Sequence, residues 1–242
     1  IKSFGQVIEL HQLLRQVGRT LIGRALYGIQ KLAGSLAANK YLRLGHRPGL
    51  PGDVAASIRK LLLPGDVLVV RKEYALTNYF LPGYWPHAAL YLGDTKELVG
   101  LGVHEQEHVK PRWARLLDSD SNTEGHVLES MRDGVNLRTL KSPFASDSVV
   151  VLRPALDRQD IGKALARGFA HEGKPYDFDF DFSCSHRMVC TEVVYRAYDG
   201  VGNVKIELPR HLGRYALAAG DLLRMALAER LFRVHAVYSP AH

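Results

Sequence analysis

Two residues of this chain have the types and local settings needed for nucleophilic catalysis by a thiol. His87 begins the apolar stretch HAALYLG, which is typical of a buried strand, and about a hundred residues later Cys190 begins the amphipathic stretch CTEVVYRAY, which is typical of a helix. The free N–H groups and the dipole of a helix N-terminus lower the pKa of a thiol, and a strand holds an imidazole base rigidly. The pair therefore predicts a cysteine nucleophile served by a histidine base.

Each cysteine has an alternative interpretation. The alternative for Cys190 is an ordinary buried thiol, since free cysteine is among the most buried residue types. Cys184 is a competing nucleophile, but it lies in the aromatic and acidic loop YDFDFDFSCS, where fixed geometry is harder to provide. Two cysteines at this spacing predict neither a disulfide framework nor a zinc site.

A third, polar group is needed to orient the imidazole. Glu129 lies in the stretch GHVLESMRDGV, within a short apolar segment that is expected to pair with the His87 strand. A carboxylate at such a place needs a cationic or N–H partner. Glu129 is therefore the predicted third member, and its alternative is a strand residue that faces solvent.

The elements that would position these residues form a strand-rich middle region between helical ends. Strands are predicted for the VLVV run after Pro64 and for residues 87–92, 98–103, 125–130, 135–140 and 148–152. Helices are predicted for 10–32, 33–41, 54–63 with Asp53 as N-cap, 157–171 with Asp157 as N-cap, 188–198 and, as one or two helices, 208–234. Residues 105–124 are expected to form a polar loop or a helical excursion. This order predicts an α+β fold.

Five segments in chain order resemble the YiiX/YebB-like branch of the NlpC-type papain-like superfamily. They read PGDVLVVRK, WPHAALYLGD, VLESMRDGV, GKPYDFDF and CTEVVYRAY. That branch is circularly permuted, so the histidine precedes the cysteine, as it does here; lecithin retinol acyltransferase is a more distant relative of the same type. The resemblance implies a permuted papain-like domain at 64–200, in which a small antiparallel sheet packs on the cysteine helix. Helical extensions are expected at 1–63 and at 201–242, the latter packed on the same core.

The resemblance implies that Cys190 is the nucleophile, His87 the base and Glu129 the polar third member. Tyr176 would line the site near the sulfur, and its hydroxyl would bind the developing oxyanion together with the backbone N–H of Cys190. The alternative for Tyr176 is a packing aromatic with a solvated hydroxyl. In such proteins the third residue usually follows the histidine strand after a short hairpin, where this chain has Gly100. Glu129 comes only after a long insertion, but its surroundings fit the family pattern and those of Gly100 do not.

The insertion also contains a match to a second catalytic motif. Residues 104–108 read HEQEH and match H-E-x-x-H, in which His104 and His108 would bind zinc from one face of a helix. Gly100 and Pro111 flank the motif and disfavour a well-formed helix. A zinc metalloprotease is therefore kept only as an alternative, and a polar surface excursion is preferred.

Composition and charge limit the kinds of molecule that the chain is expected to bind. The chain has 242 residues, of which 46% are apolar and 24% charged, as in a soluble globular protein, and no apolar run is long enough to span a bilayer. The net charge of +7 comes from scattered Lys and Arg, so nucleic acid is not predicted, while peripheral contact with a membrane or with cell-wall polymer stays open. The chain starts at Ile1 rather than at Met, which predicts a fragment or a processed form. Removal of a signal peptide is compatible with this, and neither a compartment nor an oligomeric state is predicted.

The predicted function is that of a cysteine hydrolase or acyltransferase that cleaves an amide or ester bond through a thioester. The substrate would be small and either peptide-like, as in the cell wall, or lipid-like, and no cofactor or metal is required. The aspartates at 177, 179 and 181 lack the turn glycine and the distal glutamate of a calcium loop. The main alternative is a non-catalytic binding module on the same fold.

Overall fold

The computed structural model describes residues 41–43, 45–79, 84–119, 125–177, 182, 186–211 and 214–240. The helices predicted within 10–41 lie, apart from Tyr41, outside the described residues. Cys184, Asp179 and Asp181 also lie outside them, so the predictions made for these residues stay predictions.

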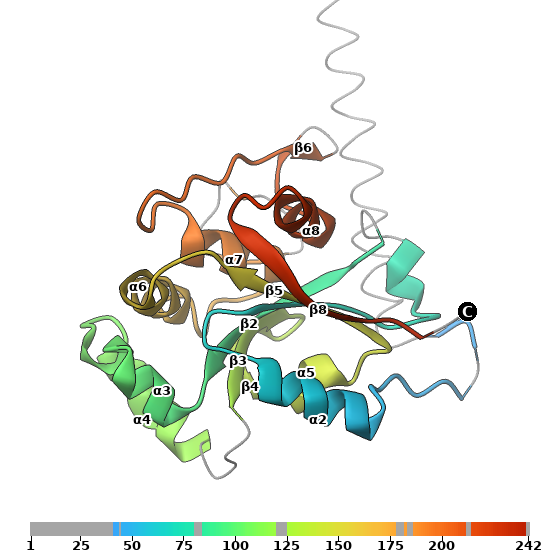
Figure 1. Ribbon diagram of the computed structural model, residues 1–242, viewed down its shortest axis with the longest axis horizontal. Coiled ribbons are helices and arrows are strands. Elements are labelled where there is room, and N and C mark those ends of the chain that lie inside the picture. The colour runs from blue at the N-terminus through green and yellow to red at the C-terminus, as the bar shows by residue number, and fades with distance from the viewer. Residues whose placement is uncertain are drawn as a thin grey trace, which may run out of the picture.

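A six-stranded antiparallel sheet forms the centre of the molecule, with the strand order β4-β3-β2-β1-β5-β8 (Figure 1). The strands are β1 (Val67–Arg71), β2 (His87–Gly93), β3 (His126–Met131), β4 (Gly134–Thr139), β5 (Ser148–Pro154) and β8 (Phe232–Tyr238). The central strands are buried on both faces, and for this reason their sequences are nearly continuous apolar runs. The predicted α+β class is confirmed.

Helices cover both faces of this sheet (Figure 1). One face packs against α6 (Arg158–Phe169), α7 (Cys190–Tyr198) and α8 (Ala219–Leu227), and the other against α2 (Gly52–Leu61) and α5 (Lys141–Phe144). Because side chains alternate along a strand, Val69 faces the first group of helices and Leu68 the second. The sheet is therefore the middle of three layers.

The segment between β2 and β3 is helical, so the strand predicted for 98–103 is wrong. It contains α3 (Thr95–Gly100), the short 3-10 helix η2 (Val103–Glu105) and α4 (Lys110–Ser119). Asp94 caps α3: its side chain accepts the N–H of Glu97 at 2.7 Å, and the Glu97 carboxylate accepts the N–H of Asp94 at 2.8 Å. This capping box sets a helical start that outweighs the apolar run LVGLGV.

The C-terminal segment contains less helix than predicted. Among the described residues of 208–234, only α8 is helical; it is preceded by a two-stranded ribbon of β6 (Arg210–His211) and β7 (Arg214–Tyr215) and followed by β8. Strand β8 pairs with β5 from Phe232 to Tyr238, with a bulge at His235. The alternation in FRVHAVY signals this strand, but the Leu- and Ala-rich sequence before it favours helix and obscures the boundary.

The remaining elements follow the predictions with small shifts at their ends. Asp157 caps α6 as predicted, accepting the N–H of Asp160 at 2.8 Å. Helix α2 begins at Gly52, so Asp53 lies in its first turn rather than at the cap, and residues Leu76–Tyr79 form the 3-10 helix η1. No helix in the described part of the chain is long and apolar enough to cross a membrane.

Candidate active site

Cys190 is the first residue of α7 and is 8% exposed. Its sulfur accepts hydrogen bonds from the backbone N–H of Thr191 and from that of Ala88 in strand β2. The residue before it, Val189, provides no side-chain cap. The N–H groups of Glu192 and Val193 donate to the Val189 carbonyl at 3.1 and 3.3 Å, whereas the N–H of Cys190 itself has no backbone acceptor among the described contacts.

His87 reaches Cys190 because β2 and β3 separate at one end. Their pairing extends from Gly93 to Leu90, so the first residues of β2 lie beyond the paired part, and Ala88 N–H bonds to the sulfur of Cys190. The turn before α7 is fixed to β3 on this side, where the buried Ser130 hydroxyl donates to the carbonyl of Met188 at 2.6 Å. The imidazole of His87 thereby lies beside the start of α7 and forms a hydrogen bond with the thiol.

Glu129 contacts the other side of the same imidazole. Its Oε2 lies 2.6 Å from His87 Nε2, and its side chain is fully buried, whereas that of His87 is 23% exposed. Continuing the antiparallel register from the Leu90–Leu128 pair places Glu129 opposite Ala89 and on the same face of the sheet as His87. Since Nε2 is occupied by the carboxylate, Nδ1 is the ring nitrogen left for the sulfur.

The electrostatics of this row of three groups favour a thiolate beside an imidazolium. Burial raises the pKa of the Cys190 thiol, but the charge and hydrogen bond of His87, helped by two backbone N–H donors, reverse the effect and lower it. Burial lowers the pKa of His87, but Cys190 and Glu129 together raise it above its ordinary value. Burial likewise raises the pKa of Glu129, but the hydrogen bond and charge of His87, the hydrogen bond of Ser142 and the charge of Arg138 bring it below the ordinary value.

Two residues that the sequence did not single out contact the free oxygen of Glu129. The Ser142 hydroxyl donates a hydrogen bond to Oε1, and Arg138 Nε lies 3.3 Å from the same oxygen. The alternation in GVNLRT places Arg138 on the same face of β4 as Asn136, which pairs with Glu129. That signal was present in the sequence, whereas nothing local connects Ser142 with the site.

The segment that leads to Tyr176 is held against β4. Val135 N–H donates to the carbonyl of Lys174, and Gly173 N–H donates to that of Val135, both at 2.8 Å. Gly134 has a φ of +96°, and a Cβ on it would lie 2.4 Å from the Lys174 carbonyl oxygen. Only glycine permits this approach.

Tyr176 itself forms a parallel backbone bridge with Met188, two residues before Cys190. Asp177 N–H donates to the carbonyl of Met188 at 3.1 Å, and Met188 N–H to that of Pro175 at 3.0 Å. Tyr176 is half-buried and packs on the core that includes α7. Its backbone is thus adjacent to the segment that enters α7, and the role of its hydroxyl stays a prediction.

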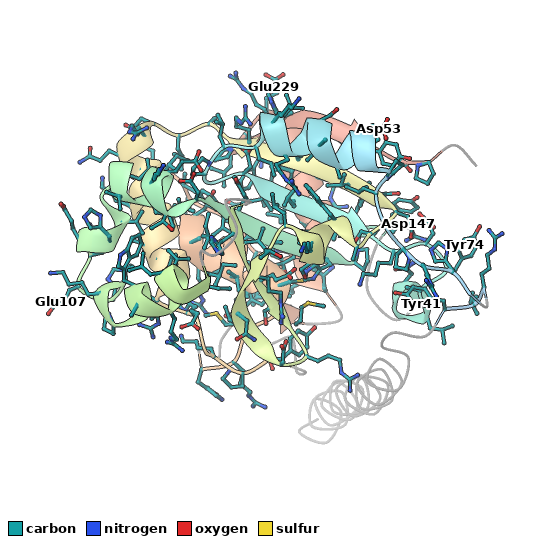
Figure 2. The ribbon with its side chains drawn as sticks, turned by 90° about the horizontal axis from the view of Figure 1, so that it is seen from below. Tyr41, Asp53, Tyr74, Glu107, Asp147 and Glu229 are labelled. Atoms are coloured by element: carbon teal, nitrogen blue, oxygen red, sulfur yellow. The ribbon has the colours of Figure 1, made fainter. Side chains whose placement is uncertain are left out.

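The other candidate positions that the sequence offered, Gly100 and the H-E-x-x-H match, lie away from this site. Gly100 ends α3, where its carbonyl accepts a bond from Arg158 at 2.8 Å, away from His87. The H-E-x-x-H match does not form one helix: His104 lies in η2, and His108 lies outside it with Nε2 2.9 Å from the Ala166 carbonyl. Glu107 points outward at the opposite end of the molecule from Tyr74 and Asp147 (Figure 2). Within the described ranges no group of three His, Cys, Asp or Glu residues is arranged to hold a metal ion.

Comparison with known proteins shows which family the chain resembles. The model of a family described as permuted papain-like amidase enzymes, YaeF/YiiX, C92 family, matches residues 62–233. Among solved structures, the crystal structure of metalloprotein yiiX from Escherichia coli O157:H7 is similar at 15% sequence identity and a TM-score of 0.45, over 75% of this chain and 97% of that chain. No curated protein matches the chain. The matched stretch contains His87, Glu129, Tyr176 and Cys190.

Proposed function

This chain belongs to the permuted papain-like amidase family, and on that basis we propose that it is a cysteine-dependent hydrolase that cleaves an amide or ester bond through Cys190. The observation that carries the proposal is the continuous row of Cys190, His87 and Glu129, in which the carboxylate lies 2.6 Å from the imidazole. In this row the thiol has a lowered pKa and the imidazole a raised one. A thiolate is the reactive form of cysteine, and an imidazolium beside it is a ready proton donor.

The proposed reaction has two halves. The Cys190 thiolate attacks the carbonyl carbon, and the developing oxyanion is bound by the Cys190 N–H and by the Tyr176 hydroxyl. His87 gives its proton to the leaving amine or alcohol, the C–N or C–O bond breaks, and a thioester remains. His87 then takes a proton from water, which attacks the thioester and releases a carboxylic acid and the thiolate. Glu129 keeps the imidazole oriented and stabilises its charged form throughout.

The backbone N–H of Cys190 is able to donate to the oxyanion. Among the described contacts it has no backbone acceptor, as expected for the first N–H of a helix. The N–H group therefore loses no existing backbone hydrogen bond when an oxyanion approaches. This supports its assignment as one of the two oxyanion donors.

The substrate is proposed to be peptide-like or lipid-like. Tyr84, 48% exposed, lies three residues before His87, and its ring stacks on the guanidinium of Arg71 at 4.1 Å. Trp85 lies edge-to-face against Tyr84 at 5.3 Å. Aromatic surface two and three residues from the base along the chain suits an acyl chain or a peptide side chain. Transfer of the acyl group to an amine or alcohol instead of water would use the same thioester and is the alternative to hydrolysis.

Alkylation of Cys190 by iodoacetamide as a function of pH tests the first step of the proposal. We expect the wild-type thiol to react rapidly below about pH 7, where an ordinary thiol is protonated. The labelling should disappear in Cys190→Ser, persist in Cys184→Ser and slow about tenfold or more in His87→Ala. Mass-spectrometric screening of amides and esters should then find a substrate whose cleavage requires Cys190.

The opposite outcome is equally informative. If Cys190 reacts only as an ordinary or buried thiol, the chemistry proposed here fails. The chain would then be a binding module that retains the family fold without turnover.

A further inference from the structure

We propose that Ser142 and Arg138 are positioning residues that hold the Glu129 carboxylate ionised and aimed at His87; this proposal rests on the function proposed above. The side chain of Glu129 is fully buried, so each of its oxygens needs a protein donor in place of water. Oε2 is matched by His87. Oε1 therefore decides whether the charged form is tolerated.

Ser142 supplies a hydroxyl donor to Oε1 from a short and well-fixed helix. It is the second residue of α5 and donates directly to the carboxylate. The helix is anchored because Phe144 N–H donates to the Leu140 carbonyl and the Phe144 carbonyl accepts from Leu50 N–H, both at 3.0 Å. Phe144 is also buried in the core beneath α2. The hydroxyl therefore approaches Glu129 from a backbone that has little freedom to move.

Arg138 supplies a permanent positive charge to the same oxygen. Its Nε lies 3.3 Å from Glu129 Oε1, while its Nη2 lies 2.6 and 2.8 Å from the two oxygens of Asp133. Asp133 lies at the turn between β3 and β4 and fixes the orientation of the guanidinium. Because arginine does not lose its proton in proteins, the charge persists at every working pH.

The Ser142 hydroxyl and the Arg138 charge act on the reaction through Glu129 alone. In the described contacts, neither Ser142 nor Arg138 reaches His87 or Cys190. Without the Ser142 hydroxyl and the Arg138 charge at Oε1, a buried carboxylate would take up a proton or turn toward another partner. A protonated Glu129 would no longer stabilise the imidazolium, and the thiolate would lose its counter-ion.

The test measures the rate of Cys190 alkylation between about pH 5 and about pH 9, together with the NMR titration of the His87 ring. In Ser142→Ala we expect the rate at about pH 6 to fall about tenfold and the His87 titration to move to lower pH, because a charge-assisted hydrogen bond is lost. Ser142→Thr should restore both. Arg138→Met should show a smaller loss of about threefold, because this pair is longer and partly exposed to solvent.

Two comparisons separate a positioning role from a general structural one. Ser148→Ala is the matched control, because this buried hydroxyl meets Ser239 Oγ at 3.2 Å and has no contact with Glu129; its profile should equal that of the wild type. In a Glu129→Gln background, Ser142→Ala should add little, since the charge that it supports is already absent.

The proposal is overturned if Ser142→Ala and Arg138→Met both keep the wild-type profile, or if Ser142→Ala is equally damaging in the Glu129→Gln background. A failure of the proposed function would give a different result: the wild-type protein itself would then show no acid-shifted alkylation.

Discussion

At the scale of single residues, the site joins a thiol, an imidazole and a carboxylate whose protonation states depend on one another. Burial alone would make Cys190 and Glu129 neutral, since desolvation penalises charge. Opposite charges in contact reverse that tendency, so that the pKa of Cys190 is lowered and that of His87 is raised. The row is stable as a set of ions and would not be stable if one member were removed.

Glu129→Gln tests the contribution of the carboxylate charge. The amide oxygen can still accept the His87 Nε2 proton, but it no longer stabilises a positive ring. We therefore expect the imidazolium to lose its proton at lower pH, which shifts the alkaline limb of the rate–pH profile to lower pH. Turnover should fall about 10- to 100-fold. Steady-state rates across the pH range measure both effects. An unchanged alkaline limb would show that the charge of Glu129 does not matter.

Tyr176→Phe tests the proposed oxyanion donor. Removal of one donor of this kind typically reduces turnover about 100-fold. Alkylation of Cys190 should be unaffected, because iodoacetamide reacts without forming an oxyanion. A variant that loses alkylation in parallel with turnover would instead show that Tyr176 supports the structure of the segment that bridges to Met188.

At the scale of elements, helix α7 itself carries a buried acid, Glu192, two residues after Cys190. Glu192 is fully buried; its Oε1 lies 3.2 and 3.0 Å from Nε and Nη2 of Arg196, and its Oε2 has no hydrogen-bond partner among the described residues. Burial, with a contribution from Asp177, raises the pKa of Glu192 to about 7, against the opposing effects of Arg196 and Lys174. The helix therefore contains a carboxyl group that the fold prefers to keep protonated.

Glu192→Gln should remove a dependence of stability on pH. A folded-state pKa above the unfolded value means that the folded chain holds the extra proton. This group's contribution to the free energy of unfolding is therefore fully present below about pH 4.5 and is lost as the pH rises to about 7, by at most about 3 kcal/mol. Urea unfolding at about pH 5 and about pH 8 should show this loss in the wild type and not in the variant.

Glu229→Gln is the control for this measurement. Glu229 is an exposed acid beyond the end of α8 and lies on the outside of the molecule (Figure 2). This variant should keep the wild-type dependence on pH. Equal slopes in all three proteins would show that Glu192 titrates normally in the folded state.

At the scale of the whole molecule, strand β8 packs against α7, the helix that carries Cys190. Phe232 of β8 is fully buried, and its ring meets that of Tyr198, the last residue of α7, edge-to-face at 5.3 Å. The Tyr198 hydroxyl donates in turn to the carbonyl of Gly65, at the turn before β1. The C-terminal strand, the cysteine helix and the first central strand thus form one packed unit.

Phe232→Ala should destabilise the molecule by about 3–5 kcal/mol, because a large buried ring is lost and the site cannot collapse fully around the gap. Val237→Ala, on the same strand but 61% exposed, should cost less than about 1 kcal/mol. Chemical denaturation of the two variants measures the difference. Equal losses would mean that β8 contributes by hydrogen bonding to β5 rather than by packing on α7.

The sequence by itself determined the features that depend on neighbours within a few residues. A strand that begins at His87, a helix that begins at Cys190 and the Asp157 cap of α6 could each be predicted, because side-chain periodicity and capping chemistry are local. The resemblance added that Glu129 belongs with the other two, despite the long insertion between β2 and β3.

Only the tertiary structure decided which groups meet across the chain. The separation of β2 from β3 that admits Cys190, the approach of Ser142 to Glu129 Oε1 and the place of β8 in the sheet all depend on contacts between separate elements. A buried carboxylate or an edge strand requires some partner, but its own sequence does not say which. That choice is made by packing, since the partners are fixed only when helices cover both faces of the sheet.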